Sequence, residues 1–520
     1  MLRRHGGPLV NPPEPTAYLP LLIALPLAVA AALVMFRVPL PLERALLLVP
    51  GALTLIASTG LLWLVRDGTV LAHNVALWQG GIAIPLVVDA FSALMLWATA
   101  LLVLVCTAFA IAAGDDRAAY FGPLVLTLSA GVVGVLLTAD VFNMFVFIEV
   151  MLLPAYGLLA MLGSRNRIRA GRVYVTVNLL TSTIFLSGVA LVYGTAGTVN
   201  LAALAGAATD SPAVAVGAGV IILALSVKAA VVPVHGWLAP SYTSTSVAVT
   251  ALFSGLHTKV AIYAIYRLYA VVFDGDTRFL WIGVAAFSLT MLIGVLGAVG
   301  ENTTRSILVF HMISQIGYIL LGAALFTELG LMAGIFYLIH NMFVKTSLFL
   351  STGAIEHTHG TGALDRLGGL AKREPLLGVV FLAAALSLAG LPPFSGFVAK
   401  VTLVAGALEA GQWAAAATAV VVSVITLMSM MKIWGGSFWG DPPEREEAGS
   451  GTGGAGEGTA EGGGALQDPP RVRTALLLPG LVLALMSLAL GLGAQALLAL
   501  SAQAAAHLLD PSTYVEAVLR

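Results

Sequence analysis

Residues 227–267 read VKAAVVPVHGWLAPSYTSTSVAVTALFSGLHTKVAIYAIYR, and this stretch indicates how the chain is built. It joins two strongly apolar segments, near residues 214–234 and 248–272, through a turn-rich junction that contains Pro233. Apolar segments of about 20 residues cross a bilayer, and they do so as helices because backbone groups in lipid must be paired within their own segment. Proline removes a backbone donor and clashes with the preceding turn, so the stretch predicts a membrane helix that is interrupted near its end.

A second break of the same kind lies in residues 388–400, LAGLPPFSGFVAK, at Pro392 and Pro393. The two breaks fall in the seventh and twelfth predicted spans, five spans apart. A unit of five helices reverses its direction with each copy, and matched interruptions in two halves mark the binding region of transporters built from repeats. The pattern therefore indicates inverted repeats, with an ordinary proline kink at each position as the alternative.

The composition of the whole chain is that of a polytopic membrane protein. Of its 520 residues, 59% are apolar and 10% are charged, whereas a soluble protein has roughly 45–50% apolar and about 25% charged residues. We predict an all-α membrane fold of about fourteen transmembrane helices, with two inverted five-helix repeats (spans 4–8 and 9–13) and discontinuous helices 7 and 12. The spans are predicted near residues 18–36, 44–65, 86–112, 118–138, 140–162, 172–194, 214–234, 248–272, 279–299, 303–326, 331–353, 376–398, 414–438 and 474–498.

The spans group into five predicted regions. The stretch 441–470 is rich in glycine, glutamate and proline and has almost no apolar residues, so it cannot bury enough surface to offset its chain entropy and is predicted to be flexible. The regions are the N-terminal helices 1–3 (1–113), the first five-helix repeat (114–273), the second five-helix repeat (274–440), the inner loop (441–472) and the C-terminal transmembrane helix with its tail (473–520).

Several classes of function are excluded by simple counts. A net charge of −1 leaves no electrostatic footprint for nucleic acid. A single cysteine, Cys106, excludes an intrachain disulfide, a cysteine zinc site and a cysteine-ligated iron–sulfur cluster. No nucleotide-binding motif or soluble catalytic domain is visible, so we expect no cofactor, no metal site and no enzymatic activity. The N-terminus lacks the pattern of a cleaved signal, so the first apolar run is predicted to be a retained span.

The distribution of basic residues predicts the orientation in the membrane. An even number of spans places both termini on one side. With the termini outside, fourteen lysines and arginines fall in inner loops and five in outer segments, as the positive-inside rule requires. Arg3 and Arg4 argue for the opposite orientation of the first helix alone. We therefore expect both termini outside, in the plasma membrane.

Four of the six lysines, Lys228, Lys259, Lys345 and Lys400, are placed at membrane depth, although arginine is about three times as common as lysine. Each charged side chain costs about 2.5–3.5 kcal/mol at a helix centre. Lysine can lose its proton when it is desolvated, whereas arginine stays charged. This choice of residue indicates proton handling.

One carboxylate accompanies the lysines. Glu149 lies about nine residues into its span, near mid-depth at 1.5 Å per residue. His257 and His340, which lie near buried lysines, are candidates for the same pathway, with a neutral core histidine as the alternative. A static buried ion pair is the alternative for the charged groups, in which case removing one partner would only destabilise the fold. One carboxylate cannot neutralise four lysines, which favours water or uncharged amines among them.

The motifs around these residues resemble a known family. The stretch 227–267, HMISQIGY (311–318), HNMFVKTSLFL (340–350) and LAGLPPFSGFVAK (388–400) are similar to the proton-pumping, antiporter-like subunits of complex I and of Mrp cation/proton antiporters. The stretch DVFNMFVFIEVMLLPAYGLL (140–159) resembles the D subunit of the Mrp antiporters more than the respiratory subunits.

The resemblance implies roles for individual residues. Glu149 matches the family's membrane carboxylate and Lys228 its paired lysine. Lys259 matches the lysine of the central axis, and Lys400 matches the lysine after the second break. His340 and Lys345 fall where the family often carries a linking histidine or lysine. The sequence departs from the family at Ala239 and in the acidic loop 441–470, which leaves the charged positions unaffected.

The expected function is therefore that of a proton-translocating subunit of a multisubunit Na⁺/H⁺ antiporter. Its expected partners are the other Mrp subunits, protons, monovalent cations (Na⁺ above all) and the lipid bilayer. A redox-driven proton-pumping subunit of a complex I-like NADH:quinone oxidoreductase or membrane-bound hydrogenase is the main alternative. A structural scaffold and a stand-alone antiporter are the others.

Overall fold

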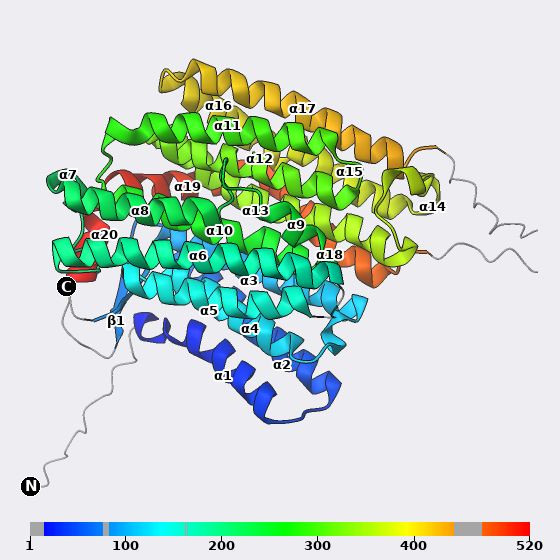
Figure 1. Ribbon diagram of the computed structural model, residues 1–520, viewed down its shortest axis with the longest axis horizontal. Helices are drawn as coiled ribbons and strands as arrows, with labels where there is room; N and C mark the ends of the chain where they lie inside the picture. The colour runs from blue at the N-terminus through cyan, green and yellow to red at the C-terminus, as the bar shows by residue number, and fades with distance from the viewer. Residues whose placement is uncertain (1–14, 76–82, 162, 164, 441–470) are drawn as a thin grey trace, which may run out of the picture.

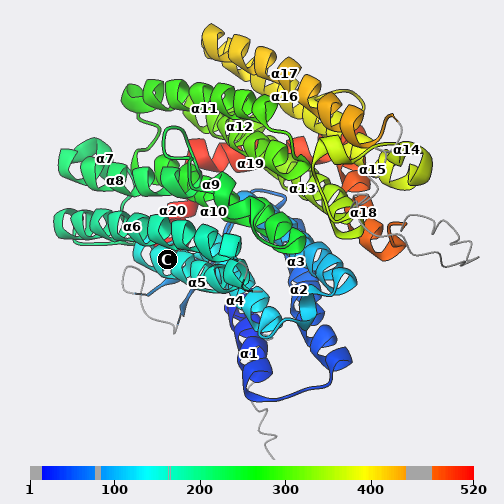
Figure 2. The ribbon, with the colours of Figure 1, turned by 45° about the vertical axis from the view of Figure 1, so that its right-hand side comes forward.

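The computed structural model describes residues 15–75, 83–161, 163, 165–440 and 471–520. The predicted loop 441–472 therefore lies almost wholly outside the described residues. The described chain is a bundle of long helices that lie side by side (Figures 1 and 2). Eleven described helices are long and apolar enough to cross a membrane, and shorter apolar helices accompany them. The predicted all-helical membrane fold is confirmed.

The helices follow the predicted spans to within a few residues at most ends, and the two short strands pair antiparallel. The elements are α1 (Leu21–Met35), α2 (Leu40–Val65), β1 (Leu71–Asn74), β2 (Pro85–Val88), α3 (Ala90–Ala113), α4 (Phe121–Leu137), α5 (Val141–Ala160), α6 (Arg165–Ala196), α7 (Ala207–Asp210), α8 (Pro212–Lys228), α9 (Leu238–Thr243), α10 (Val247–Val272), α11 (Leu280–Gly300), α12 (Thr304–Leu325), α13 (Glu328–His359), α14 (Leu370–Arg373), α15 (Pro375–Ala389), α16 (Ser395–Glu409), α17 (Trp413–Ser437), α18 (Thr474–Leu492), α19 (Ala494–Leu509) and α20 (Ser512–Leu519).

The first predicted break separates α8 from α9. α8 ends at Lys228, and Pro233 lies in the irregular segment that follows. Ala230 takes a left-handed conformation here, with φ of 61°. The freed backbone is partly satisfied from neighbouring elements, because the amide of Val232 donates to Thr290 Oγ1 on α11 at 3.1 Å. The first break is therefore held against the second half of the chain.

The second predicted break separates α15 from α16. α15 ends at Ala389, and Gly390 follows in a left-handed conformation with φ of 89°. Pro392 and Pro393 occupy the turn before α16. The predicted end of this span near residue 398 is wrong, because α16 continues to Glu409. The proline pair stops one helix, and the apolar residues after it form another.

The C-terminal region contains a further interruption that the sequence prediction missed. The predicted span 474–498 is two helices, α18 and α19. α18 packs against the second break so closely that a Cβ atom at Gly491 would lie 2.2 Å from the Pro393 carbonyl oxygen. The chain then continues as α19 and α20, which lead to the end of the bundle where α1 begins (Figure 1).

Features of the first half recur 163 residues further along the chain. A short backbone bridge joins Asp140 to Asn200 in the first half, and another joins Thr303 to Ala363 in the second. Gly131 and Gly134 of α4 allow α5 to approach closely. Gly294 and Gly297 of α11 do the same for α12. This recurrence supports a repeat of five spans, although the repeat boundaries given above stay a prediction.

Three helices form the centre of the bundle. The apolar 18-residue core of the span is completely buried in α10 and α13 and 94% buried in α12. The same core is only 22% buried in the span that contains α1 and in the span that contains α11. The outer helices present their apolar residues to the surroundings. The central helices carry Lys259, His311 and Lys345, so these polar groups lie in the interior of the protein.

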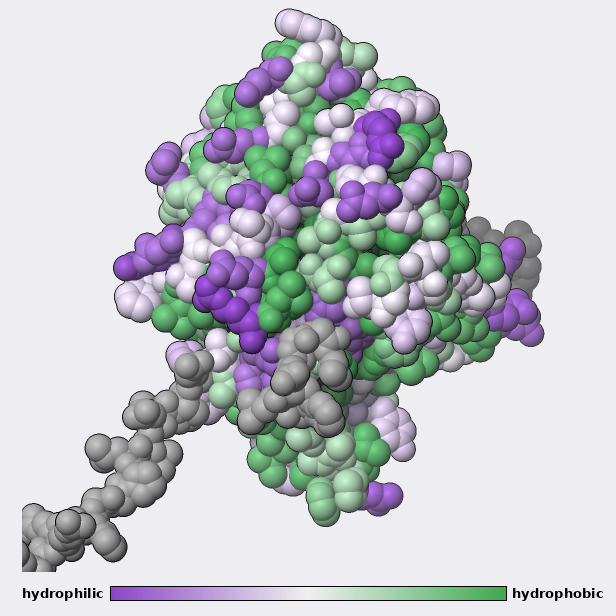
Figure 3. All heavy atoms as spheres, turned by 90° about the vertical axis from the view of Figure 1, so that its left-hand side faces the viewer, coloured by the Kyte–Doolittle hydropathy of each residue, from purple (hydrophilic) through white to green (hydrophobic). Residues whose placement is uncertain are grey.

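A buried ion pair joins the start of α3 to α10 at the end of the bundle where α20 lies. Asp89 caps α3 through a capping box with Ser92 and forms an ion pair of 2.7 Å with Arg267 of α10. Both side chains are buried, and Tyr514 of α20 places its ring 4.8 Å from the Arg267 guanidinium carbon. Hydrophilic residues are spread over this end of the molecule (Figure 3).

Candidate functional site

The Glu149 carboxylate and the Lys228 amine share one partner. Ser182 of α6 donates a hydrogen bond to Glu149 Oε1, and Lys228 Nζ donates to Ser182 Oγ at 3.4 Å. Glu149 lies on α5 and is half-buried, whereas Lys228 is buried at the end of α8. Three helices thus converge on one hydroxyl, and the predicted acid–lysine pair is joined through Ser182.

The backbone beyond Lys228 is braced by an aromatic side chain. Trp237 Nε1 donates to the Val227 carbonyl oxygen at 2.9 Å. This bond crosses the first break and satisfies an acceptor that lacks its helical partner at the end of α8. Lys228 therefore stands at a helix end whose position depends on both sides of the break.

His257 is the next polar group along the bundle. Its Nδ1 atom lies 2.9 Å from the hydroxyl oxygen of Tyr174 on α6, and its ring stacks on Phe253. Nε2 of His257 is buried without a hydrogen-bond partner in the described structure. One ring nitrogen is thus fixed by protein, and the other is available to water or to a transferred proton.

Lys259 and Lys345 are both inaccessible to solvent, and each donates to a backbone carbonyl. Lys259 Nζ bonds the Ser254 oxygen of its own helix at 2.7 Å. Lys345 Nζ bonds the Leu308 oxygen on α12, also at 2.7 Å. Neither amine has a carboxylate partner in the described part of the chain. A carbonyl is a neutral acceptor, so these amines are the least compensated charges in the bundle.

Lys400 lies at the second break. Its Nζ atom donates to the Ala389 carbonyl oxygen at 2.9 Å and to Ser423 Oγ of α17 at 2.9 Å. The Tyr318 ring lies 5.3 Å from the same atom. Lys400 therefore joins the end of α15 to α16 and α17 and occupies the junction of the discontinuous helix.

His340 lies on the other side of that junction. Nδ1 of His340 is 2.8 Å from Ser395 Oγ at the start of α16, and Nε2 is buried without a partner among the described residues. Gly396 allows this approach, because a Cβ atom there would lie 3.0 Å from His340 Cε1. The sequence indicated only that His340 lies near buried lysines, and its place beside the second break is added by the structure.

The buried basic groups influence one another electrostatically along the bundle. Lys228 acts on His257, and Lys259 acts on Lys345. His311 of α12, which hydrogen-bonds Ser429 of α17, lies within the influence of Lys345 and Lys400. Lys400 in turn acts on His340 (an electrostatic contact across the second break). The predicted residues therefore fall into two groups of neighbours, with Glu149, Lys228 and His257 in the first and Lys259, Lys345, Lys400 and His340 in the second.

Polar atoms without partners lie among these groups. Buried polar groups are normally hydrogen-bonded, and an orphaned atom indicates an ordered water when the site is polar. The described atoms of this kind include Ser254 Oγ, Thr258 Oγ1, both amide atoms of Asn341, Gln315 Nε2, His257 Nε2, His311 Nδ1 and His340 Nε2. They lie on α10, α12 and α13, which suits a hydrated path between the lysines.

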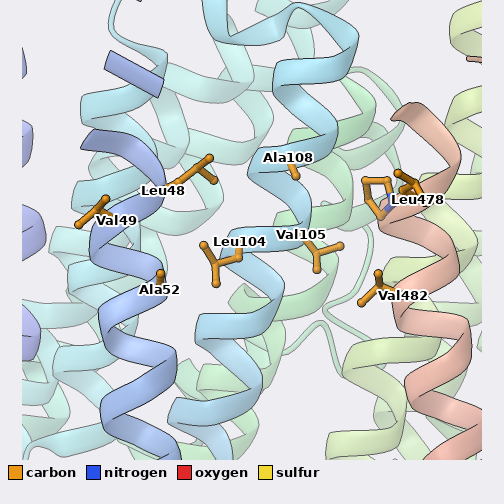
Figure 4. A pocket seen from close by; sticks show the side chains of 9 residues that line it. Leu48, Val49, Ala52, Leu104, Val105, Ala108, Leu478 and Val482 are labelled. Atoms are coloured by element: carbon orange, nitrogen blue, oxygen red, sulfur yellow. The ribbon is translucent and has the colours of Figure 1, made fainter. Parts of the chain in front are cut away.

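Two other features lie away from these groups. Among the described residues, no group of three or more His, Cys, Asp and Glu side chains is arranged to hold a metal ion. A groove of about 420 Å³ lies between α2, α3 and α18, and its lining residues are all apolar. Figure 4 shows the aliphatic side chains that line it, with Leu104 between the helices. Such a lining offers no ligand for a cation.

The structure adds residues that the sequence interpretation did not assign to the site. Ser182 of α6 joins Glu149 to Lys228. His311 of α12 contacts Ser429 of α17. Gln315 accepts a hydrogen bond from Tyr337. The only available signal was the presence of polar residues within otherwise apolar spans.

Comparison with known proteins gives the class to which this fold and site belong. Residues 138–426, more than half of the chain, match the transmembrane family described as NADH:quinone oxidoreductase/Mrp antiporter. The chain belongs to this family. The matched stretch contains both breaks and every predicted pathway residue, from Glu149 to Lys400.

Individual relatives place the chain more narrowly. The D subunit of a Na(+)/H(+) antiporter from Alkalihalophilus pseudofirmus is 35% identical over 508 residues, which cover 96% of this chain and 99% of the relative. A chain of the Mrp complex from Dietzia sp. DQ12-45-1b is 54% identical, with a TM-score of 0.92 and coverage of 98% of this chain and 100% of that one. The predicted resemblance to the D subunit of Mrp antiporters is confirmed.

A respiratory assembly provides a more distant likeness. A chain of the membrane-bound sulfane sulfur reductase, an archaeal respiratory membrane complex, is 26% identical, with a TM-score of 0.84. The match covers 96% of this chain and 99% of that chain. The same architecture therefore occurs in assemblies of different chemistry, and the fold alone does not distinguish between them.

Proposed function

We propose that this chain is the proton-translocating subunit of a multisubunit Na⁺/H⁺ antiporter of the Mrp type, in which it acts as part of a secondary transporter. The single observation that supports this most strongly is the burial of four lysines, Lys228, Lys259, Lys345 and Lys400, inside the helix bundle. A fold without a transport role has no need for four buried amines at membrane depth, because each costs stability. The relatives named as the D subunit of Na(+)/H(+) antiporters support the same function.

In this mechanism proton transfer starts at Lys228, beside the first break. Glu149 and Ser182 hold Lys228 in its charged form. When that contact loosens, the desolvated ammonium gives up a proton more readily. The proton passes through water and His257 towards Lys259, because the orphaned polar atoms there provide sites for water.

The second half carries the proton onward. Lys345 and His311 lie between Lys259 and the second break. Lys400 and His340, on either side of that break, form the exit or the coupling point to a neighbouring subunit. Each elementary charge that crosses the membrane is worth about 2.3 kcal/mol per 100 mV. Inward proton movement can therefore drive the export of a cation by the assembled complex.

The location and orientation follow from the same proposal. We expect the complex in the plasma membrane, with partner subunits of the Mrp type. α1 begins and α20 ends at the same end of the bundle (Figure 1), and the excess of basic residues at the other end favours an outer location for the termini. Labelling of a cysteine introduced beside Arg520 by a membrane-impermeant reagent in intact cells tests this orientation.

The decisive experiment measures exchange by the assembled complex. Glu149→Gln, Lys228→Ala, Lys259→Ala and Lys400→Ala are each introduced, and Na⁺-dependent pH change is followed in vesicles. Lys372, an exposed residue of the short helix α14, supplies a matched control, Lys372→Ala. The pathway variants are expected to lose exchange while the control retains it. A Lys228→Ala complex that assembles normally and exchanges at the full rate contradicts the proposal.

The likeness to an archaeal respiratory complex favours a second candidate, a redox-driven proton pump. In that case the buried lysines would respond to electron transfer in another subunit. The purified complex distinguishes the two functions: an imposed Na⁺ gradient moves protons in an antiporter, whereas only an electron donor and acceptor do so in a redox pump. A scaffold role predicts that the charge-neutral variants lose assembly.

A further inference from the structure

A row of three serine hydroxyls connects His340 to the second break. His340 Nδ1 lies 2.8 Å from Ser395 Oγ, which lies 2.9 Å from Ser487 Oγ. Ser487 Oγ lies 2.7 Å from Ser387 Oγ. The four groups come from α13, α16, α18 and α15, and all are buried. We call these three serine residues the serine row.

Close packing brings the row together. Ser487 and Gly491 lie one turn apart on α18 and therefore share a face. A Cβ atom at Gly491 would lie 2.2 Å from the Pro393 carbonyl oxygen, and one at Gly396 would lie 1.7 Å from the Ser387 carbonyl oxygen. The absence of side chains at these glycines lets α15, α16 and α18 approach within hydrogen-bond distance. The contact is thus built by several elements and does not depend on one flexible side chain.

The direction of the hydrogen bonds in the serine row depends on whether His340 Nδ1 carries a proton. A serine hydroxyl has one proton to donate and also accepts. If His340 Nδ1 carries a proton, it donates to Ser395, and the hydroxyls donate onward through Ser487 towards Ser387. If Nδ1 is bare, Ser395 donates to it and the row is reversed. The row therefore satisfies either tautomer of His340.

The other ring nitrogen of His340, Nε2, differs from Nδ1, because it is buried and has no hydrogen-bond partner among the described residues. A proton that arrives at Nε2 forms an N–H bond there, and the imidazolium then returns to neutrality by breaking the Nδ1–H bond. Ser395 is the acceptor in contact with Nδ1, and as it accepts, its own proton passes to Ser487 and the Ser487 proton to Ser387. Ser387 releases its proton to a water molecule at the second break, so each hydroxyl gains one proton and gives up one. Transfer through the imidazole thus requires that the row be able to reverse.

We propose that Ser487 of α18 is a positioning residue for His340, which keeps both tautomers of the imidazole accessible during proton transfer. This inference rests on the proposed function. Without the Ser487 hydroxyl, Ser395 keeps one partner in the row and donates permanently to Nδ1, which fixes the proton of neutral His340 on Nε2. The C-terminal helix, which lies outside both predicted repeats, would thereby take part in conduction.

The test compares Ser487→Ala with Ser487→Thr in the assembled complex. The loss of one buried hydrogen bond predicts about a tenfold lower rate of Na⁺-dependent proton exchange for Ser487→Ala, and Ser487→Thr should recover most of it. Ser501→Ala is the control, since Ser501 of α19 is equally buried and its hydroxyl has no partner in the described structure. Full exchange by an assembled Ser487→Ala complex would overturn the inference.

A second pair of variants at Ser487 separates the effect of side-chain shape from the effect of the hydroxyl group. If Ser487→Ala does not assemble, Ser487→Thr and Ser487→Val provide side chains of nearly equal shape that differ in the hydroxyl. The threonine variant should exchange faster, and equal rates refute the role of the hydroxyl. In a His340→Ala background, Ser487→Ala should cause no additional loss, whereas an unchanged tenfold loss would show that Ser487 acts independently of His340.

These results are distinguishable from failure of the proposed function. If Lys228→Ala abolishes exchange and Ser487→Ala does not affect it, only the inference about the serine row is wrong. If Lys228→Ala leaves exchange unchanged, the proposed pathway itself is wrong, whatever the serine variants show.

Discussion

Lys228 and Glu149 meet on a single hydroxyl, that of Ser182, which donates to the carboxylate and accepts from the amine at 3.4 Å. An indirect contact of this kind is easier to open than a two-point ion pair, because a change in the rotamer of the Ser182 side chain removes both bonds. Since the amine also stands at the end of α8, small movements of the first break reach it directly. The pairing is therefore suited to a step that must be reversed in every transport cycle.

Ser182→Ala should lower the rate of Na⁺-dependent proton exchange by about tenfold, because the amine and the carboxylate lose their shared partner. Ser182→Thr should keep the hydroxyl and most of the rate. The matched control is Ser187→Ala on the same helix, where the exposed hydroxyl only bonds the Thr183 carbonyl. Exchange is measured in vesicles with equal amounts of assembled complex. Equal loss in the Ser182 and Ser187 alanine variants would contradict the bridging role.

Lys228→Arg should abolish exchange even though the positive charge remains. A guanidinium keeps its proton at all accessible pH values, so it can pair with Glu149 but cannot pass a proton on. Assembly, followed by blue-native electrophoresis, should be normal. Exchange by the arginine variant at the full rate would support a static ion pair in place of a proton carrier. Lys372→Arg, at an exposed position of α14, serves as the control.

The charged part of the site could be predicted from the sequence because charge is rare in lipid. Lys259 and Lys345 attract attention in any apolar span, and a proline pair such as Pro392 and Pro393 identifies a break by its local chemistry. These signals are carried by single positions. They require no knowledge of which helices are neighbours, so the membrane fold and the burial of the lysines could be predicted, while the pathway role of these residues stays a prediction.

The hydroxyl contacts could not be predicted in the same way. Ser395 and Ser487 meet although they are 92 residues apart, and a serine within an apolar helix ordinarily bonds its own backbone. The interruption after α18 was also missed, because Gly491 and Gly493 do not prevent a helix and no proline is present there. The close approach of Gly491 to Pro393 is a tertiary contact, which the local sequence does not reveal.

Arg267→Leu should destabilise the protein by about 3–5 kcal/mol, because it leaves the Asp89 carboxylate buried without its partner. The expected result is a lower unfolding temperature and less assembled complex. Arg278→Leu is the control, since its ion pair with Asp276 is on an exposed arginine and should contribute little. If both variants unfold at the same temperature as the unmodified protein, the stabilising role of the Asp89–Arg267 pair is wrong.

Stability should depend on Asp115, which lies in the turn between α3 and α4. Burial raises the pKa of the Asp115 carboxyl, and the Ser246 hydroxyl and the Arg167 charge only partly offset this. The folded state then binds the proton more tightly than the unfolded state. The contribution of Asp115 to the free energy of unfolding therefore falls as pH rises from its ordinary pKa in the unfolded chain through its raised pKa in the folded protein. Asp115→Asn should therefore raise the unfolding temperature at pH 7 and have no such effect at pH 3. A lower unfolding temperature at pH 7 would contradict the sign.

Gly294→Ala should destabilise the packing of α11 on α12 by about 1–3 kcal/mol, because a Cβ atom would lie 2.3 Å from the Ser314 amide nitrogen. Gly219→Ala is the control, since a Cβ atom there meets nothing within 4 Å. Thermal unfolding of the two variants in the same detergent gives the comparison. A loss confined to Gly294→Ala supports the close helix approach, whereas equal unfolding temperatures would refute it.

The bridges at Asp140–Asn200 and Thr303–Ala363 lie at opposite ends of the bundle, so a rotation that exchanges them also exchanges the two compartments. Machinery related by such a pseudo-twofold axis has little intrinsic polarity, and the direction of net flow is then set by the electrochemical gradients. α18 departs from this symmetry, because it packs on the break between α15 and α16 and lies outside both predicted repeats. Any rectification of the current should therefore originate on the side of the molecule that α18 touches.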